Sequence, residues 1–192
     1  DLDILEKELS KESKREKKLI IPVHFGGLPC NMSKIGKIAK KYNCYVVEDA
    51  SQAMGARFKN KLIGNCKFSD FTIFSLHPVK SITTGEGGLI LTNNYKFFRK
   101  VSILRSHGLV KDSKHHWKND MKLLGYNYKF TEFQSALGIS QLQKLKKFLS
   151  KRHEIAKFYS INLNKNKVKF QKYDKNLYYH AYHYFILRFK KK

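Results

Sequence analysis

The order strand, helix, strand near the start of the chain constrains its fold most. Residues 19–24 are mostly apolar and read as a buried strand, and the apolar run 45–47 begins a second strand at 45–48. Between them, residues 32–42 place Ile35, Ile38 and Ala39 on one side of an expected helix. This order is typical of a parallel sheet with helices packed on it. The sequence therefore predicts an α/β fold.

The segment 71–88 carries the most informative chemistry. An apolar strand pattern ends at the hydroxyl of Ser75, and Lys80 follows without charged neighbours within two residues on either side. Glycines at 85, 87 and 88 then allow a tight turn. An amine in such surroundings loses its proton more readily and can attack a carbonyl. The alternatives are a solvated surface lysine and an ordinary hairpin-like turn.

A carboxylate, Asp49, follows the apolar run that begins at residue 45. In open α/β sheets, ligands bind outside the carboxyl ends of the strands, so we expect Asp49 to face a ligand. Beside a reactive lysine, such a carboxylate can keep the ring nitrogen of pyridoxal phosphate (PLP) protonated. The alternative is a helix N-cap before Ser51. Together with Lys80, the pattern favours the cofactor.

Five motifs occur in one order, and together they are far more specific than any one of them. They are Glu48-Asp49-Ala-Ser-Gln52, Phe74-Ser75-Leu-His-Pro-Val-Lys80, Gly85-Glu86-Gly87-Gly88, Arg105-Ser-His107-Gly108 and Leu124-Gly125-Tyr-Asn127-Tyr. This series closely resembles the DegT/DnrJ/StrS-type sugar aminotransferases, which are PLP enzymes of the aspartate-aminotransferase fold. The segments 81–88 and 117–142 look most like members of the pseudaminic-acid pathway.

The resemblance implies a role for five residues. Lys80 would be the catalytic lysine that binds PLP and then moves a proton, while Asp49 would bind the ring nitrogen. Ser75 would contact the phosphate, and Gln52 would lie near the ring. Asn127 would contact the phosphate in the neighbouring subunit's site, which requires a homodimer of the full-length protein. The alternatives are a structural serine, a helix-surface glutamine and a turn asparagine.

The reaction implied by the resemblance is transfer of an amino group from glutamate to the C4 ketone of a nucleotide-linked 4-keto-6-deoxy sugar, in surface-glycan biosynthesis. Aminotransferases for other dTDP- or GDP-linked keto sugars remain an alternative, as does a truncated remnant without activity. Two positions depart from the family pattern: Lys129 replaces an arginine, and Leu76 replaces an aromatic residue.

The resemblance also predicts a three-layer α/β/α fold of PLP-transferase fold type I, present in part. Family members run to about twice this length, with two domains. We therefore expect a fragment, with residues 1–150 forming a partial PLP-binding large domain. Residues 151–192 would form a linker helix and the beginning of a small α+β domain.

Composition narrows the partners. The formal net charge is +24, but the lysines are scattered over the polar sides of amphipathic patterns, which argues against nucleic-acid binding. Three widely spaced cysteines without a CxxC pair predict no disulfide framework and no metal site, and they fit a cytoplasmic location. No apolar run is long enough to cross a bilayer, so we expect no membrane span.

The remaining periodicities predict further elements. Helices are expected at 2–9, 95–105, 131–148 and 151–163, with Thr131 as an N-cap. Strands are expected at 70–75, 88–92 and 180–189, with a turn between two short extended pieces at 59–64 and a polar connection at 164–176.

Overall fold

The computed structural model describes residues 1–13, 16–112, 114–115 and 117–189. The helices are α1 (Leu2–Lys11), α2 (Met32–Lys41), α3 (Tyr95–Arg105) and α4 (Glu132–Asn162), with a short 3-10 turn, η1 (Phe25–Gly27). The strands of the first half are β1 (Lys18–Ile20), β2 (Cys44–Asp49), β3 (Arg57–Phe58), β4 (Lys61–Leu62), β5 (Phe71–Ser75) and β6 (Gly88–Leu91). Those of the second half are β7 (Leu109–Lys111), β8 (Asn119–Met121), β9 (Val168–Phe170), β10 (Tyr178–Tyr179) and β11 (Leu187–Phe189).

The central sheet has four strands in the order β1-β2-β5-β6. The pairs β1·β2 and β2·β5 are parallel, as the strand-helix-strand order predicts. Strand β6 runs antiparallel to β5. The connection between these two strands, residues 76–87, contains no helix, and such a short return joins neighbouring strands only in the antiparallel sense.

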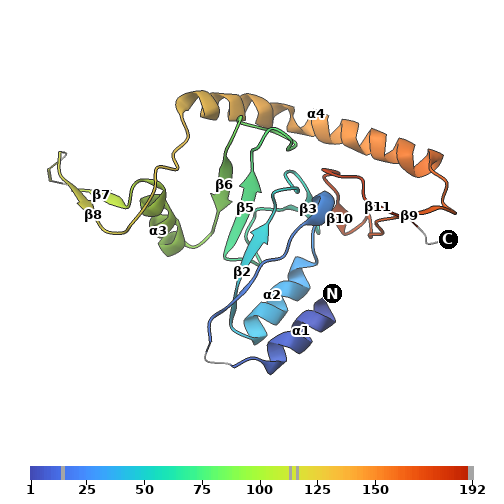
Figure 1. Cartoon of the computed structure of the whole chain (residues 1–192), viewed down its shortest axis with the longest axis horizontal. Helices are drawn as coiled ribbons and strands as arrows, with labels where there is room; N and C mark the ends of the chain where they lie inside the picture. Colours follow the sequence, from blue (N-terminus) through green and yellow to red (C-terminus); the bar gives the residue numbers. More distant parts are fainter. Residues whose placement is uncertain (14–15, 113, 116, 190–192) are drawn as a thin grey trace.

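Helices cover both faces of this sheet. On one face α2 buries Met32 and Ile35 in a core with Val46 of β2, and α1 packs on the outside of α2. On the opposite face, Phe97 of α3 stacks on Phe71 of β5 with 5.0 Å between ring centroids. The expected three-layer α/β/α arrangement is therefore present, with α4 passing along one end of the layers (Figure 1).

Helix α4 corrects the expectation of two helices at 131–148 and 151–163, because it runs unbroken from Glu132 to Asn162. No glycine or proline stands near position 150 to end the first helix. The predicted cap is confirmed: the Thr131 hydroxyl accepts from the backbone of Gln134, whose side chain in turn accepts from the backbone of Thr131. The division into domains at 150/151 falls inside α4 and stays a prediction.

The continuous strand expected at 180–189 is wrong. Only Leu187–Phe189 is a strand there, and it pairs with β9, which lies inside the expected polar connection. The backbone is irregular before it, with Tyr182 in the left-handed region at a φ of 46°. The cause is tertiary: Ala181 N–H donates to Gly27 O at 2.9 Å, and Tyr184 N–H donates to Gly26 O at 3.1 Å. Residues 181–184 therefore bond to the glycine turn and not to a neighbouring strand.

Among the described residues, no helix combines the length and the apolarity that crossing a membrane requires.

Candidate active site

The carboxyl ends of β2 and β5 bring Asp49 and Ser75 to one edge of the sheet. Asp49 is aligned with Ile73 on the neighbouring parallel strand, and Ser75 follows two residues later. Because side chains alternate along a strand, Asp49, Ile73 and Ser75 lie on the same face of the sheet. Ile73 and Ser75 are about 7 Å apart along β5. Asp49 Oδ1 also accepts a hydrogen bond from the Ser51 backbone at 3.0 Å. This contact caps a turn, since no helix follows.

Gln52 lies in that turn and holds a glycine-rich neighbour. Its Oε1 accepts a hydrogen bond from the Gly26 N–H at 2.7 Å. Gly27 follows with a φ of 96°, and a Cβ at this position would lie 2.7 Å from the Gln52 carbonyl oxygen. Gln52 therefore positions the glycine turn beside the strand-end carboxylate, although it is not one helical turn from Asp49 as its spacing suggested.

Lys80 lies in the loop between β5 and β6. The base of this loop is closed by Leu76, which is buried and whose N–H donates to the Gly87 carbonyl at 2.8 Å. The far side is fastened to α4, because Gln134 Nε2 donates to the Glu86 carbonyl at 3.2 Å. The loop that holds Lys80 therefore begins at the strand end that carries Ser75.

His183 is a residue of this region that the sequence did not reveal. Its side chain is buried, with 7% of the residue exposed. Burial, together with the nearby charges of Lys80 and Arg152, lowers its pKa to about 4, so the imidazole is neutral at physiological pH. Among the described residues, neither ring nitrogen has a hydrogen-bond partner. The sequence suggested only that His180 and His183 would face opposite sides of a strand, and that strand does not exist.

The glycine turn lies between Gln52 and His183. The backbone carbonyl of Gln52 approaches Gly27. The backbone of His183 also lies against Gly27, since a Cβ on Gly27 would be 3.1 Å from the backbone nitrogen of His183. The charge of Lys80 is one of the causes that lower the pKa of His183. The elements that carry Asp49, Gln52, Ser75 and Lys80 therefore meet at one edge of the sheet. Their expected contacts with a cofactor stay a prediction.

Asn127 lies elsewhere. It is exposed, on the segment between β8 and α4, and its backbone bridges to Ser106 just beyond the end of α3. In Figure 1 the β7–β8 unit beside this segment projects outward beyond α3. Three residues further along this segment, the Phe130 ring lies against Gly87 of the lysine loop. The expected role in a neighbouring subunit's site stays a prediction.

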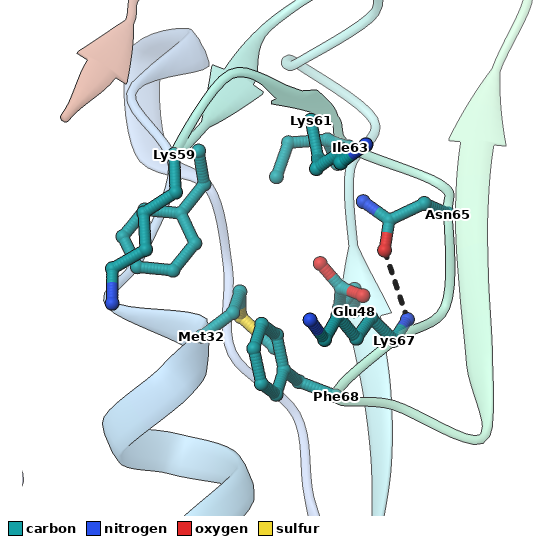
Figure 2. A pocket seen from close by; sticks show the side chains of 9 residues that line it. Met32, Glu48, Lys59, Lys61, Ile63, Asn65, Lys67 and Phe68 are labelled. Atoms are coloured by element: carbon teal, nitrogen blue, oxygen red, sulfur yellow. Dashed lines mark hydrogen bonds between the residues drawn. The ribbon is translucent and has the colours of Figure 1, made fainter.

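A second polar cluster occupies the opposite face of the sheet. Glu48 points toward α2, where its Oε2 lies 3.0 Å from Nε2 of the buried His24. Burial alone would raise the pKa of Glu48, but hydrogen bonds from His24, Ser69 and Thr72 outweigh it and hold this pKa below its usual value. Figure 2 shows Glu48 beside a cavity of about 140 Å³ that Met32 and Lys67 help to line. This cavity is separate from the Lys80 edge.

Comparison with known proteins gives this site a context. The sequence model of the DegT/DnrJ/EryC1/StrS aminotransferase family matches residues 1–192. A UDP-4-amino-4,6-dideoxy-N-acetyl-beta-L-altrosamine transaminase of Campylobacter jejuni is 48% identical over 144 residues, which are 75% of this chain and 37% of the relative. GDP-perosamine synthase of Escherichia coli O157:H7 is 34% identical over 157 residues, covering 82% of this chain and 42% of the relative.

Among solved structures, PseC of Helicobacter pylori, an aminotransferase of pseudaminic-acid biosynthesis, superimposes with a TM-score of 0.85 at 29% identity. The likeness covers 97% of this chain and 49% of PseC. The fold expected from the sequence is thereby confirmed. The chain spans less than half the length of the curated relatives it matches.

Proposed function

Because the chain belongs to the DegT/DnrJ/EryC1/StrS aminotransferase family, we propose that the protein transfers an amino group from glutamate to a nucleotide-linked sugar. The acceptor is the C4 ketone of a 4-keto-6-deoxy sugar, the cofactor is PLP, and the product serves surface-glycan biosynthesis. One observation carries this proposal: the strand-end carboxylate of Asp49, the Ser75 hydroxyl and the Lys80 loop come from two adjacent parallel strands at the same edge.

The residues at this edge fit PLP chemically. An aromatic phosphate with an aldehyde requires an amine, a carboxylate for its ring nitrogen and donors for its phosphate, which Lys80, Asp49 and Ser75 supply. The buried imidazole nitrogens of His183 have no partner among the described residues, so hydrogen-bonding capacity remains open at the same place. When bound, PLP withdraws electrons from the carbon that carries the amino group.

Each of these side chains has a defined task in this proposal. The Asp49 carboxylate keeps the ring nitrogen protonated, and the Ser75 hydroxyl donates to the phosphate. The Lys80 Nζ would hold the cofactor and, as a free amine, would carry a proton to and from the reacting carbon. Gln52 holds the Gly26 turn and faces the edge of the ring.

The sugar class follows from the relatives. The transaminase of Campylobacter jejuni is named for a UDP-linked amino sugar, which supports a UDP-linked acceptor for this protein. The similarity to GDP-perosamine synthase supports a second candidate, a GDP-linked 4-keto sugar. The net charge of +24 favours the approach of either anionic nucleotide sugar.

The partner of this chain is, in our proposal, a second copy of itself. Asn127 is exposed, and its neighbours Tyr126 and Tyr128 are exposed by 61% and 68%. A homodimer would cover these rings and bring Asn127 to the other subunit's phosphate. The three cysteines are free thiols, which is consistent with a cytoplasmic location.

The test begins with cofactor binding by the intact protein. PLP is added, the visible absorption band of the lysine-bound cofactor is recorded, and borohydride reduction fixes the label for peptide mapping. We expect the label on Lys80, and its loss in Lys80→Ala but not in the matched control Lys59→Ala. Amino transfer from glutamate is then compared for UDP- and GDP-linked 4-keto sugars. A folded protein without the band would favour the inactive remnant.

A further inference from the structure

The His183 ring stands out among the buried polar side chains of the described residues. Among the buried side-chain nitrogen and oxygen atoms of the described residues, its Nδ1 and Nε2 are those that lack a hydrogen-bond partner. A buried polar atom without a partner destabilises the folded state, and native proteins contain few of them. Such an atom therefore requires a reason.

His180, three residues earlier, shows how this protein ordinarily satisfies a buried imidazole. It is 1% exposed, and its Nε2 lies 3.2 Å from the Gln171 Oε1. Its Nδ1 accepts a hydrogen bond from the Tyr182 N–H at 2.9 Å. The neighbouring histidine thus has a partner on each nitrogen, while His183 has none.

The backbone holds His183 firmly in place. Arg152 Nη1 donates to the carbonyl oxygens of Tyr182 at 3.0 Å and of His183 at 3.3 Å. The next residue, Tyr184, donates its N–H to the Gly26 carbonyl, and its ring packs on the imidazole with 4.2 Å between centroids. The backbone of His183 and Tyr184 is therefore anchored at the glycine turn, and the buried His183 ring packs on Tyr184.

The charges around this ring determine its protonation. Burial and the cations Lys80 and Arg152 hold its pKa near 4, so the ring is neutral and offers one N–H donor and one acceptor. Lys80 is the proposed point of attachment for PLP, and the backbone of His183 lies against Gly27, which also approaches the Gln52 backbone. The unused donor is thus available to an anionic oxygen of a cofactor attached to Lys80.

We propose that His183 is a cofactor-binding residue that donates a hydrogen bond to an oxygen of the PLP held at Lys80. This inference rests on the proposed function and adds a group from the C-terminal end of the chain to the cofactor site. It also explains why the donor nitrogen of the ring has no partner among the described residues, because its partner is the ligand and not the protein.

The experiment titrates PLP into the intact protein and its variants and follows the visible band. His183→Phe keeps a flat ring but removes both nitrogens, so we expect about fivefold to tenfold weaker binding, the effect of one lost hydrogen bond. Without PLP, its melting temperature should equal or exceed that of the wild type, because no unsatisfied atoms remain. His183→Gln, which retains a donor, should recover most of the affinity.

His180→Phe is the matched control. It loses two satisfied hydrogen bonds, so its melting temperature without PLP should fall, the opposite of the result for His183→Phe. Unchanged PLP affinity in His183→Phe overturns the inference. A melting temperature of His183→Phe that falls as far as that of His180→Phe also contradicts it.

A measurement on the wild type keeps the inference testable if His183→Phe does not fold. The ring nitrogens are labelled with ¹⁵N, and the His183 signals are recorded with and without PLP. A shift on binding supports the hydrogen bond, and unmoved signals with Lys80 labelled by borohydride overturn this inference alone. Absence of the Lys80 label in the wild type removes both this inference and the proposed function.

Discussion

The glycine turn against the C-terminal segment gives the sharpest test of the structure, through Gly27→Ala compared with Gly85→Ala. Both glycines have left-handed backbones, with φ of 96° and 82°. A Cβ at Gly85 would meet no atom within 4 Å, whereas one at Gly27 would lie 2.7 Å from the Gln52 carbonyl oxygen. The pair therefore separates the cost of the backbone conformation from the cost of a collision.

The magnitudes follow from these contacts. An alanine in the left-handed region costs about 1–2 kcal/mol, of which reduced freedom of the unfolded chain offsets about 0.4–1 kcal/mol. Gly85→Ala should therefore lower the free energy of unfolding by about 1 kcal/mol. Gly27→Ala must also displace backbone and weaken the hydrogen bond from Ala181 N–H to Gly27 O, at about 1 kcal/mol more for that bond. With the collision, we expect a total loss of about 3 kcal/mol.

Urea unfolding of the intact protein, followed by far-ultraviolet circular dichroism, measures both values under the same conditions. The reasoning predicts a difference of about 2 kcal/mol between the two variants. Equal losses would show that neither the Gln52 backbone nor residues 181–184 press against the turn. The position of His183 against the glycine turn would then lose its structural basis.

Two further predictions concern burial. The pKa of His180 is lowered to about 4 by burial and by His153, so the folded state stays neutral while an unfolded histidine binds a proton below about pH 6.5. Stability should therefore fall as the pH drops from about 6.5 toward 4, by about 2 kcal/mol at pH 5 for this residue, and urea unfolding at pH 7 and 5 should show a smaller difference in His180→Phe. Leu149→Ala removes a side chain that is 6% exposed and should cost about 3 kcal/mol, whereas Leu142→Ala on the same helix, 55% exposed, should cost less than about 1 kcal/mol. Similar melting temperatures for these two variants would contradict the packing of Leu149 in the hydrophobic core.

Much of the fold was readable from local patterns. Helix α3 matches its expected range, and the strand ends at Asp49 and Ser75 follow from apolar runs that close with polar residues. These features depend on residues close in sequence, so periodicity and capping reveal them. The rule that the carboxyl ends of parallel strands share one edge of the sheet also predicts that these two strand ends lie together.

The errors arose where distant contacts decide the structure. The alternation in 180–189 resembled a strand, but hydrogen bonds to Gly26 and Gly27 hold residues 181–184 in an irregular path. The place of His183 against the glycine turn depends on the same contacts, and no local pattern records them. The fusion of two expected helices into α4 has a simpler cause, since a polar stretch around residue 150 interrupts an amphipathic pattern without ending a helix.

The pairing of the glycine turn with residues 181–184 also governs when the site is completed. It joins parts of the chain about 150 residues apart, and closing so long a loop costs entropy and delays folding. During synthesis, the lysine loop and both strand ends leave the ribosome well before the histidine does. In a nascent chain, the glycine turn and the loop that carries Lys80 therefore stand without residues 181–184 until those residues have been made.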